Sequence, residues 1–146
     1  MKSIFFVVSE GSSIDLSTNA LSIFNIIEGI GSASLPLIIP KCIITLVVER
    51  EESDPEPIEG RITITNNEHE IHSAPAQIHA RGAPSARLSI TINGLPVHAP
   101  GKLTFKYTVN DSNFEAQTSI SVSEPKVSGE QHSEPAGSIS TPLPSC

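Results

Sequence analysis

Strict alternation of apolar residues with hydroxyl-bearing or charged residues is the feature that most restricts how this chain can fold. In segments 61–65 and 87–92, every second residue is Ile or Leu, and most of the residues between them are Thr or Ser. A period of two places the apolar side chains on one face of an extended strand and the hydroxyls on the other. We therefore predict half-buried strands of an antiparallel sheet at these positions.

The same alternation occurs twice more near the C-terminus, in segments 102–109 and 114–123. Between them lies Asn110-Asp111-Ser112-Asn113, whose side chains are of the kind that bond their own backbone in turns. We predict a β-hairpin here. Phe105 belongs to the apolar half of the first segment and is expected in the core.

Two other segments, 4–8 and 37–48, are almost continuously apolar, as is typical of central strands. Segment 4–8 is shorter than the roughly 7 to 15 apolar residues of a secretory signal, so we interpret it as the first strand. Pro40 cannot donate to a ladder, so we predict a bulge or a strand start there. Cys42 is expected to be a buried small hydrophobe with no disulfide to Cys146.

Segment 14–30 is ambiguous. Leu21 and Phe24 lie at helical spacing, but the segment is rich in β-branched residues and contains Gly29 and Gly31. We favour a strand over a helix.

Turn residues and one acidic connector separate these segments. The connector is 49–59, which we expect to be extended and solvated, and the predicted turns are Asn66-Asn67, Gly82-Ala83-Pro84, Asn93-Gly94 and Pro100-Gly101. Seven to nine short strands with such punctuation predict an all-β fold, a two-sheet antiparallel β-sandwich of the immunoglobulin-like or jelly-roll-like kind, over residues 1–123. A closed barrel is the alternative. Residues 124–146 are rich in Ser and Pro and are expected to form a disordered tail.

The order of segments resembles a family of small bacterial β-sandwich proteins of unknown function, over residues 2–123. The resemblance rests on the apolar first strand, Leu21-Ser22-Ile23-Phe24-Asn25-Ile26-Ile27, Pro36, the acidic connector, and Ala99-Pro100-Gly101-Lys102-Leu103-Thr104-Phe105 before the last hairpin. That last stretch is also similar to the final hairpin of immunoglobulin-like domains. The resemblance implies a sandwich fold and no particular activity.

The charge balance excludes one class of partner. The chain has 16 Asp and Glu against 9 Lys and Arg, a net charge of -7. Because phosphate contacts supply most of the affinity of proteins for DNA, we expect no binding to nucleic acid. No apolar run approaches the roughly 20 residues of a membrane-spanning helix, and the cysteines form no disulfide framework, so we expect a cytoplasmic protein without membrane association.

Histidine is the most concentrated reactive residue type, with His69, His72, His79 and His98 within a span of 30 residues. In a regular strand, His72 shares a face with Glu70 and not with His69. The sequence has neither a zincin motif nor a His-x-His pair, so we expect no metal site and no cofactor.

If a small-molecule or metal site exists, the candidate ligand-binding residues are His72, His79, Arg81 and His98. The first three lie in one polar stretch, and His98 lies in the connection before the last hairpin. Loops from separate strands gather at one end of a sandwich, so these two segments are expected to meet.

The sequence contains no Gly-x-Ser-x-Gly elbow and no Gly-rich phosphate loop, so we name no catalytic residue and expect no enzyme. The first functional hypothesis is a non-enzymatic module that binds another protein, or itself, through loops or an exposed sheet edge. One alternative is a small ligand-binding or metal-binding sandwich, or an enzyme on the same scaffold, with its site among the histidines. The other is a self-assembling subunit of a phage-like particle.

Overall fold

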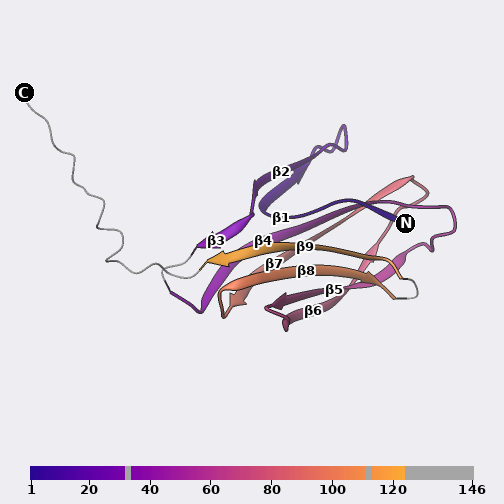
Figure 1. The fold of residues 1–146 in the computed structure, drawn as a ribbon. Coiled ribbons are helices and arrows are strands. Elements are labelled where there is room, and N and C mark those ends of the chain that lie inside the picture. The colour runs from indigo at the N-terminus through magenta and orange to yellow at the C-terminus, as the bar shows by residue number, and fades with distance from the viewer. Residues whose placement is uncertain (32–33, 111–112, 124–146) are drawn as a thin grey trace, which may run out of the picture.

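Two β-sheets pack face to face in the computed structural model, which describes residues 1–31, 34–110 and 113–123 (Figure 1). The described residues contain strands and no helix, which confirms the predicted all-β sandwich. One sheet has the strand order β2-β1-β4-β7 and the other β3-β9-β8-β5-β6. The strands are β1 (Lys2–Ile14), β2 (Leu21–Ile26), β3 (Gly29–Gly31), β4 (Leu37–Glu49), β5 (Ile58–Asn66), β6 (His69–Ile78), β7 (Ser85–Val97), β8 (Gly101–Val109) and β9 (Glu115–Ser123).

The core lies between the sheets and is built from the apolar half of each alternating strand. β8 contributes Leu103, Phe105 and Tyr107, none of which is exposed, as predicted for Phe105. These residues pack in one cluster with the apolar residues of β5 and with Ile44 and Leu46 of β4. Aliphatic side chains dominate this core, because the chain has no Trp and one Tyr.

Segment 14–30 is extended, as favoured from its β-branched residues: it forms the end of β1 and the strands β2 and β3. Cys42 is fully buried and its thiol is free, so its interpretation as a small core hydrophobe is confirmed. The predicted tail, 124–146, lies outside the described residues, as do Cys146 and the centre of the β8–β9 turn.

Two predictions about β4 and β7 are wrong. β4 runs through Pro40 with no register shift against β7. On its other edge, β4 pairs with β1 only as far as Ile43, so no β1 residue needs a hydrogen bond from position 40. Asn93-Gly94 lies inside β7 and does not reverse the chain. Gly94 has a φ of 74°, a left-handed conformation that glycine adopts at little cost, and the strand continues on both sides of it.

The acidic connector between β4 and β5 is more ordered than its composition predicts. The Glu51 amide donates to Asp54 Oδ2 (2.7 Å), and the amino group of Met1 donates to Glu51 Oε1 (2.8 Å). The hydrogen bond with Glu51 is the main reason why the pKa of the amino terminus is raised. The connector therefore holds the start of β1 in place.

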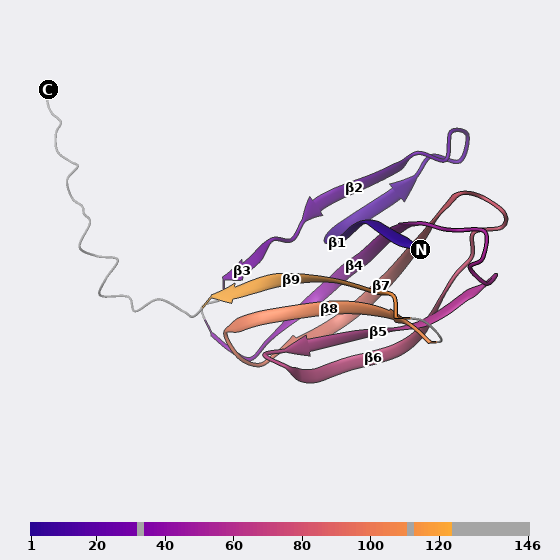
Figure 2. The same ribbon diagram turned by 45° about the vertical axis from the view of Figure 1, so that its right-hand side comes forward.

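β1 is bent, and this bend determines the shape of the four-stranded sheet. Its first half pairs with β4 from Lys2 to Ser9, and its second half pairs only with β2 (Figure 2). A straight continuation would carry Ile14 toward the β4 residues before Lys41. Instead, Ile14 lines the same cavity as Val47, and Arg87, the β7 partner of Val47, donates to the Asn19 carbonyl oxygen in the turn that follows β1. The second half of β1 therefore runs back over the sheet.

Candidate functional site

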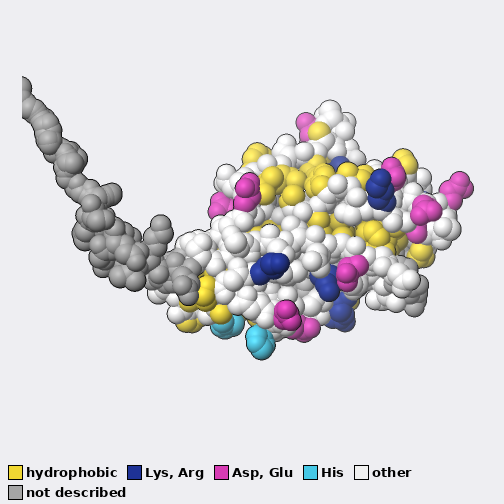
Figure 3. Space-filling model, in the orientation of Figure 1, with side chains coloured by type: hydrophobic (Ala, Val, Ile, Leu, Met, Phe, Trp, Pro, Cys, Tyr) yellow, Lys and Arg dark blue, Asp and Glu magenta, His cyan; other side chains and the backbone are white. Residues whose placement is uncertain are grey.

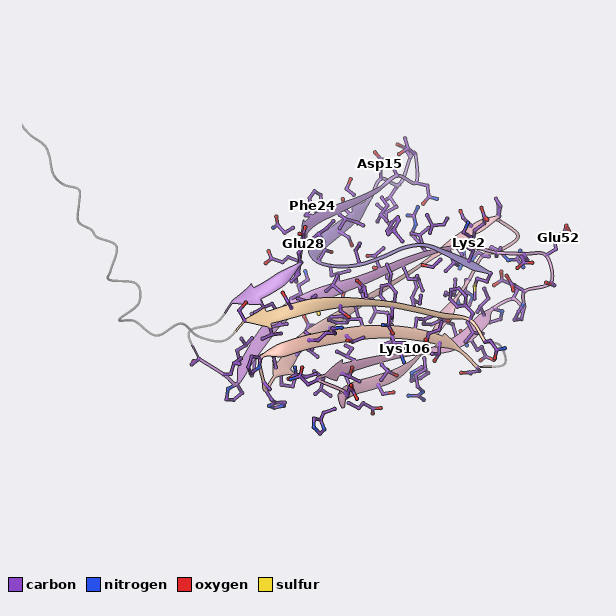
Figure 4. The ribbon with its side chains drawn as sticks, in the orientation of Figure 1. Lys2, Asp15, Phe24, Glu28, Glu52 and Lys106 are labelled. Atoms are coloured by element: carbon purple, nitrogen blue, oxygen red, sulfur yellow. The ribbon has the colours of Figure 1, made fainter. Side chains whose placement is uncertain are left out.

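The folded-back hairpin, residues 10–26, is here called the flap; it comprises the second half of β1, its turn and β2. Asp15 builds the tip, since its Oδ1 accepts hydrogen bonds from the Ser17 amide (2.8 Å), the Ser17 hydroxyl (2.7 Å) and the Thr18 amide (3.2 Å). These bonds hold the pKa of Asp15 below its ordinary value. Figure 4 shows Asp15 at the far end of the flap.

The flap covers part of the outer face of the four-stranded sheet. Ser9, Ile43 and Thr45 are buried although they point away from the core between the sheets, in alternation with Val8, Ile44 and Leu46. Thr45 Oγ1 has no hydrogen-bond partner among the described residues. We infer that the flap excludes water from this part of the outer face.

The outside of the flap exposes large apolar side chains. Leu16 at the turn is 98% exposed, and Phe24 and Ile26 on β2 are each 51% exposed. Figure 3 shows a band of hydrophobic side chains over β1 and β2, and Figure 4 places Phe24 on the flap. Ile4 and Phe5 are also exposed on the first half of β1.

A cavity of about 610 Å³ lies between the flap tip and the sheet. The flap contributes Ile14 and Asn19, and β4 contributes Val47. The remaining wall is the β6–β7 connection and the start of β7, lined by His79, Ala80, Arg81, Ala83, Ser85, Ala86 and Arg87. The cavity, here called the flap cleft, has basic and apolar walls and no Asp or Glu among these lining residues.

Glu56 and Arg87 each make hydrogen bonds that hold part of the flap cleft in place. The Glu56 carboxylate accepts hydrogen bonds from the Ala80 amide (3.0 Å) and the Arg81 amide, and lies 3.9 Å from His79 Nδ1. These bonds hold the turn that carries His79 and Arg81. Arg87 Nη2 donates to the Asn19 carbonyl oxygen (3.1 Å), which joins β7 to the flap tip.

The structure brings together only two of the four predicted site residues. His79 and Arg81 line the flap cleft, just after β6 ends at Ile78. The His98 amide donates to Asn66 Oδ1 (3.0 Å), and Asn66 pairs with His69 at the other end of β6. With a rise of about 3.4 Å per residue, the two ends of β6 are roughly 30 Å apart. The prediction that His98 meets His79 and Arg81 is therefore wrong.

His72 lies on β6, three residues from the end at His69 and six from the end at Ile78, so it is nearer to His98 than to His79 and Arg81 along the sheet. It pairs with the buried Ile64, whereas Glu70 pairs with Thr65 on the other face, because a register shift separates these two pairs. The prediction that His72 and Glu70 share a face is wrong for this reason: one extra residue on β6 reverses the alternation.

The described residues contain no metal site and a further cavity that is a weaker candidate for a binding site. No group of three or more His, Cys, Asp or Glu side chains is placed to hold a metal ion within the described ranges. A second cavity, of about 540 Å³, lies on the outer face of the five-stranded sheet beside Lys102 and Lys106. It also contains Glu68, and Lys106 is paired with Glu115 (3.4 Å), so its charges are largely balanced.

Sequence reasoning did not find Arg87 or the exposed flap residues. Arg87 looks like one more polar residue of an alternating strand, and only its position opposite Val47, under the flap, gives it a place in the cleft. The one available signal for the flap is the density of large apolar residues in segment 14–30, which predicts a strand but not the exposure of its side chains. Exposure of such residues depends on the bend in β1.

Comparison with known proteins places the chain in a family without assigning an activity. No curated protein matches it. No helix in the described part of the chain is long and apolar enough to cross a membrane. Residues 5–123 match the model of a family described as "Family of unknown function (DUF6941)", and these residues contain nearly all of the two sheets, the flap and the flap cleft. The chain therefore belongs to the family of unknown function DUF6941.

Proposed function

We propose that this chain is a non-enzymatic β-sandwich module that binds a protein partner through the outside of the flap. The observation that carries the proposal is the exposure of Leu16, Phe24 and Ile26 on one projecting hairpin. Large apolar side chains gathered on a surface mark interaction sites more often than singly scattered ones do. A phenylalanine and two branched aliphatics can act as anchors that fill pockets of a partner.

The edge of the sheet at β2 supports the same proposal. β2 is the outermost strand of its sheet and pairs with β1 alone among the described strands. Its other edge leaves backbone N–H and C=O groups available for an added strand, the mode known as β-augmentation. β6, at the edge of the other sheet, carries Pro75 and a register shift, two features that discourage added strands.

The strand order supports an immunoglobulin-like interpretation of the scaffold. β1, β4 and β7 correspond in order to strands A, B and E of variable-type immunoglobulin domains, and β9, β8, β5 and β6 to strands G, F, C and C′. Such sandwiches commonly present binding residues on loops and turns, such as the flap tip, that a rigid scaffold of strands positions. We also infer that the module works in the cytoplasm, where a free thiol such as Cys42 stays reduced, and that it binds no nucleic acid.

The proposal is tested by capture of partners with three immobilised forms of the protein. The forms are the wild type, the double variant Phe24→Ser/Ile26→Ser, and Ile38→Ser as a matched control. Ile38 is 65% exposed on β4, outside the flap, so the control removes exposed apolar surface elsewhere on the same sheet. Because all three residues are at least half exposed, the variants should fold, which a thermal melt checks.

The expected result is a protein that the wild type and Ile38→Ser retain and that the flap variant loses. If the captured protein is this same chain, light scattering of the purified forms will show a dimer that only the flap variant dissociates. Identical capture by all three forms would overturn the proposal.

A further inference from the structure

We propose that the flap cleft binds a small organic anion, a carboxylate or phosphate group attached to an apolar body. This site is separate from the outside of the flap, since Phe24 and Ile26 do not line it. The inference rests on the charges that face the cavity, their lack of acidic partners and the nature of the remaining walls.

Within the described residues, the two arginines of the cleft have no carboxylate partner, although the chain holds 16 acidic residues against 9 basic ones. Among the described residues, no hydrogen bond or ion pair engages the Arg81 side chain, and Arg87 uses one nitrogen on the Asn19 carbonyl. A guanidinium has five N–H donors in a planar fork, so most donors of both residues remain for a ligand. That fork matches the oxygens of a carboxylate or a phosphate.

Two acidic residues lie beside the cleft and offset part of its positive charge. Glu49 pairs across the strands with the lining residue Ser85, and the Glu56 carboxylate accepts hydrogen bonds from the Ala80 and Arg81 amides. The ring of His79 lies 3.9 Å from the same carboxylate and adds a third nitrogen-bearing side chain to the lining. The guanidinium groups of Arg81 and Arg87 therefore supply the positive charge of the lining, which an organic anion would meet in an otherwise acidic protein.

The rest of the cleft is suited to an apolar body. Ile14 and Val47 line it from the flap and the sheet, and Ala83 adds an exposed methyl group on the other wall. Ala80 and Ala86 also belong to the lining, although both are largely buried in the core. A volume of about 610 Å³ is typical of sites for small organic ligands. Inorganic phosphate alone would leave the apolar walls without contacts, so an anion with a hydrocarbon part is expected to bind more tightly.

The experiment titrates the full chain with phenyl phosphate, benzoate, inorganic phosphate and neutral benzyl alcohol, followed by amide shifts in NMR spectra. We expect phenyl phosphate or benzoate to saturate at a dissociation constant of about 1 mM or lower, with the largest shifts at the amides of the β6–β7 connection. Whichever of these two binds more tightly identifies the anionic group. Inorganic phosphate and benzyl alcohol should each bind at least about tenfold more weakly, because inorganic phosphate lacks the apolar body and benzyl alcohol lacks the negative charge.

Two variants and a matched control decide whether the cleft is responsible. Arg81→Gln removes one charge without breaking any described side-chain contact, and Arg87→Gln removes the other together with the bond to Asn19. Each should weaken binding at least about tenfold. The control, Arg61→Gln, removes the same charge from β5, where Arg61 Nη1 donates to Ser73 Oγ, and should leave affinity unchanged.

The outcomes are distinct. Saturable binding that Arg81→Gln weakens, and Arg61→Gln does not, establishes the site even if Arg87→Gln disturbs the flap. No saturation by either aromatic anion, or shifts centred on Lys102 and Lys106, would overturn the proposal. Equal affinity in all variants would overturn it as well. None of these results depends on whether the flap binds a protein.

Discussion

Tyr107 shows how a single side chain connects three strands. It lies on β8, and its hydroxyl donates to the Ala76 carbonyl oxygen of β6 (3.2 Å), two strands away across β5. The ring passes over Gly60, the β5 residue between them, where a Cβ atom would stand 2.5 Å from the tyrosine hydroxyl oxygen. The site therefore requires a residue without a side chain at position 60.

Burial raises the pKa of Tyr107 to about 12 from an ordinary value of 10.0. The folded chain thus holds the phenolic proton more tightly than the unfolded chain does. The contribution to stability is complete below about pH 10 and is lost as the pH rises toward 12. Because the chain has one Tyr and no Trp, phenolate absorbance follows this group alone. We expect a midpoint near 12 in the native protein and near 10 in urea; a native midpoint of 10 would contradict the burial.

Gly60→Ala should lower the free energy of unfolding by about 3 kcal/mol, because the new methyl group overlaps the Tyr107 ring and the Thr108 carbonyl. Gly31→Ala is the matched control, since a Cβ atom there meets nothing within 4 Å. Its effect should stay within about 0.5 kcal/mol. Urea denaturation of both variants measures the difference, and similar values for the two would show that the ring can move aside.

At the scale of strands and turns, Asn66 joins two connections. Its Oδ1 accepts from the His98 and Ala99 amides, each at 3.0 Å, and its Nδ2 donates to the Ala99 carbonyl (3.2 Å). The buried side chain thereby ties the end of β5 to the β7–β8 turn. The adjacent turn at Asn67 adds bonds to the same connection, with Asn67 Nδ2 donating to the Pro100 carbonyl (2.7 Å).

Asn66→Ala should cost about 2 to 4 kcal/mol, because it leaves two amides of the turn without their acceptor. Asn93→Ala is the comparison, since Asn93 is exposed on β7. We expect thermal melts to separate the two variants by several degrees. Equal melting temperatures would mean that water replaces the side chain at the turn.

The strands themselves were largely predictable, and their irregularities were not. Alternation locates β5, β7, β8 and β9, because a period of two is a local property of the sequence. The register shift in β6, the continuation of β4 through Pro40 and the bend of β1 each depend on which strand lies alongside. His79 and Arg81 lie close together in the sequence and could be named as candidates. Arg87 lines the same cavity only because of how β7 and the flap pack, which the sequence does not reveal.

For the whole molecule, the structure separates a closed core from a projecting hairpin. Ile62, Ile64 and Phe105 are completely buried between the sheets, whereas most flap residues are exposed. The sequence indicates two sheets, but not the strand order β2-β1-β4-β7, because neighbours in a sheet are set by contacts distant in sequence.

Hydrogen exchange should reflect this division. Amides of β2 are expected to exchange through local opening, many-fold faster than those of β5 and β8, which should exchange only on global unfolding. The amides of β8 serve as the internal reference. Exchange of β2 as slow as that of β8 would show that the flap unfolds together with the core.

The bend in β1 has a consequence for engineering. The chain departs from the sandwich after Ser9 and returns at Ile27, whose amide donates to the carbonyl oxygen of Val8, the residue before Ser9, at 2.8 Å. Because a hydrogen bond already joins these two points, the residues between them could be replaced by another loop whose ends lie equally close together. The entropic cost of closing such a loop is modest and grows only slowly with its length. A shortened protein made this way would need polar residues in place of Ile43 and Val47, which the excised hairpin would leave facing water.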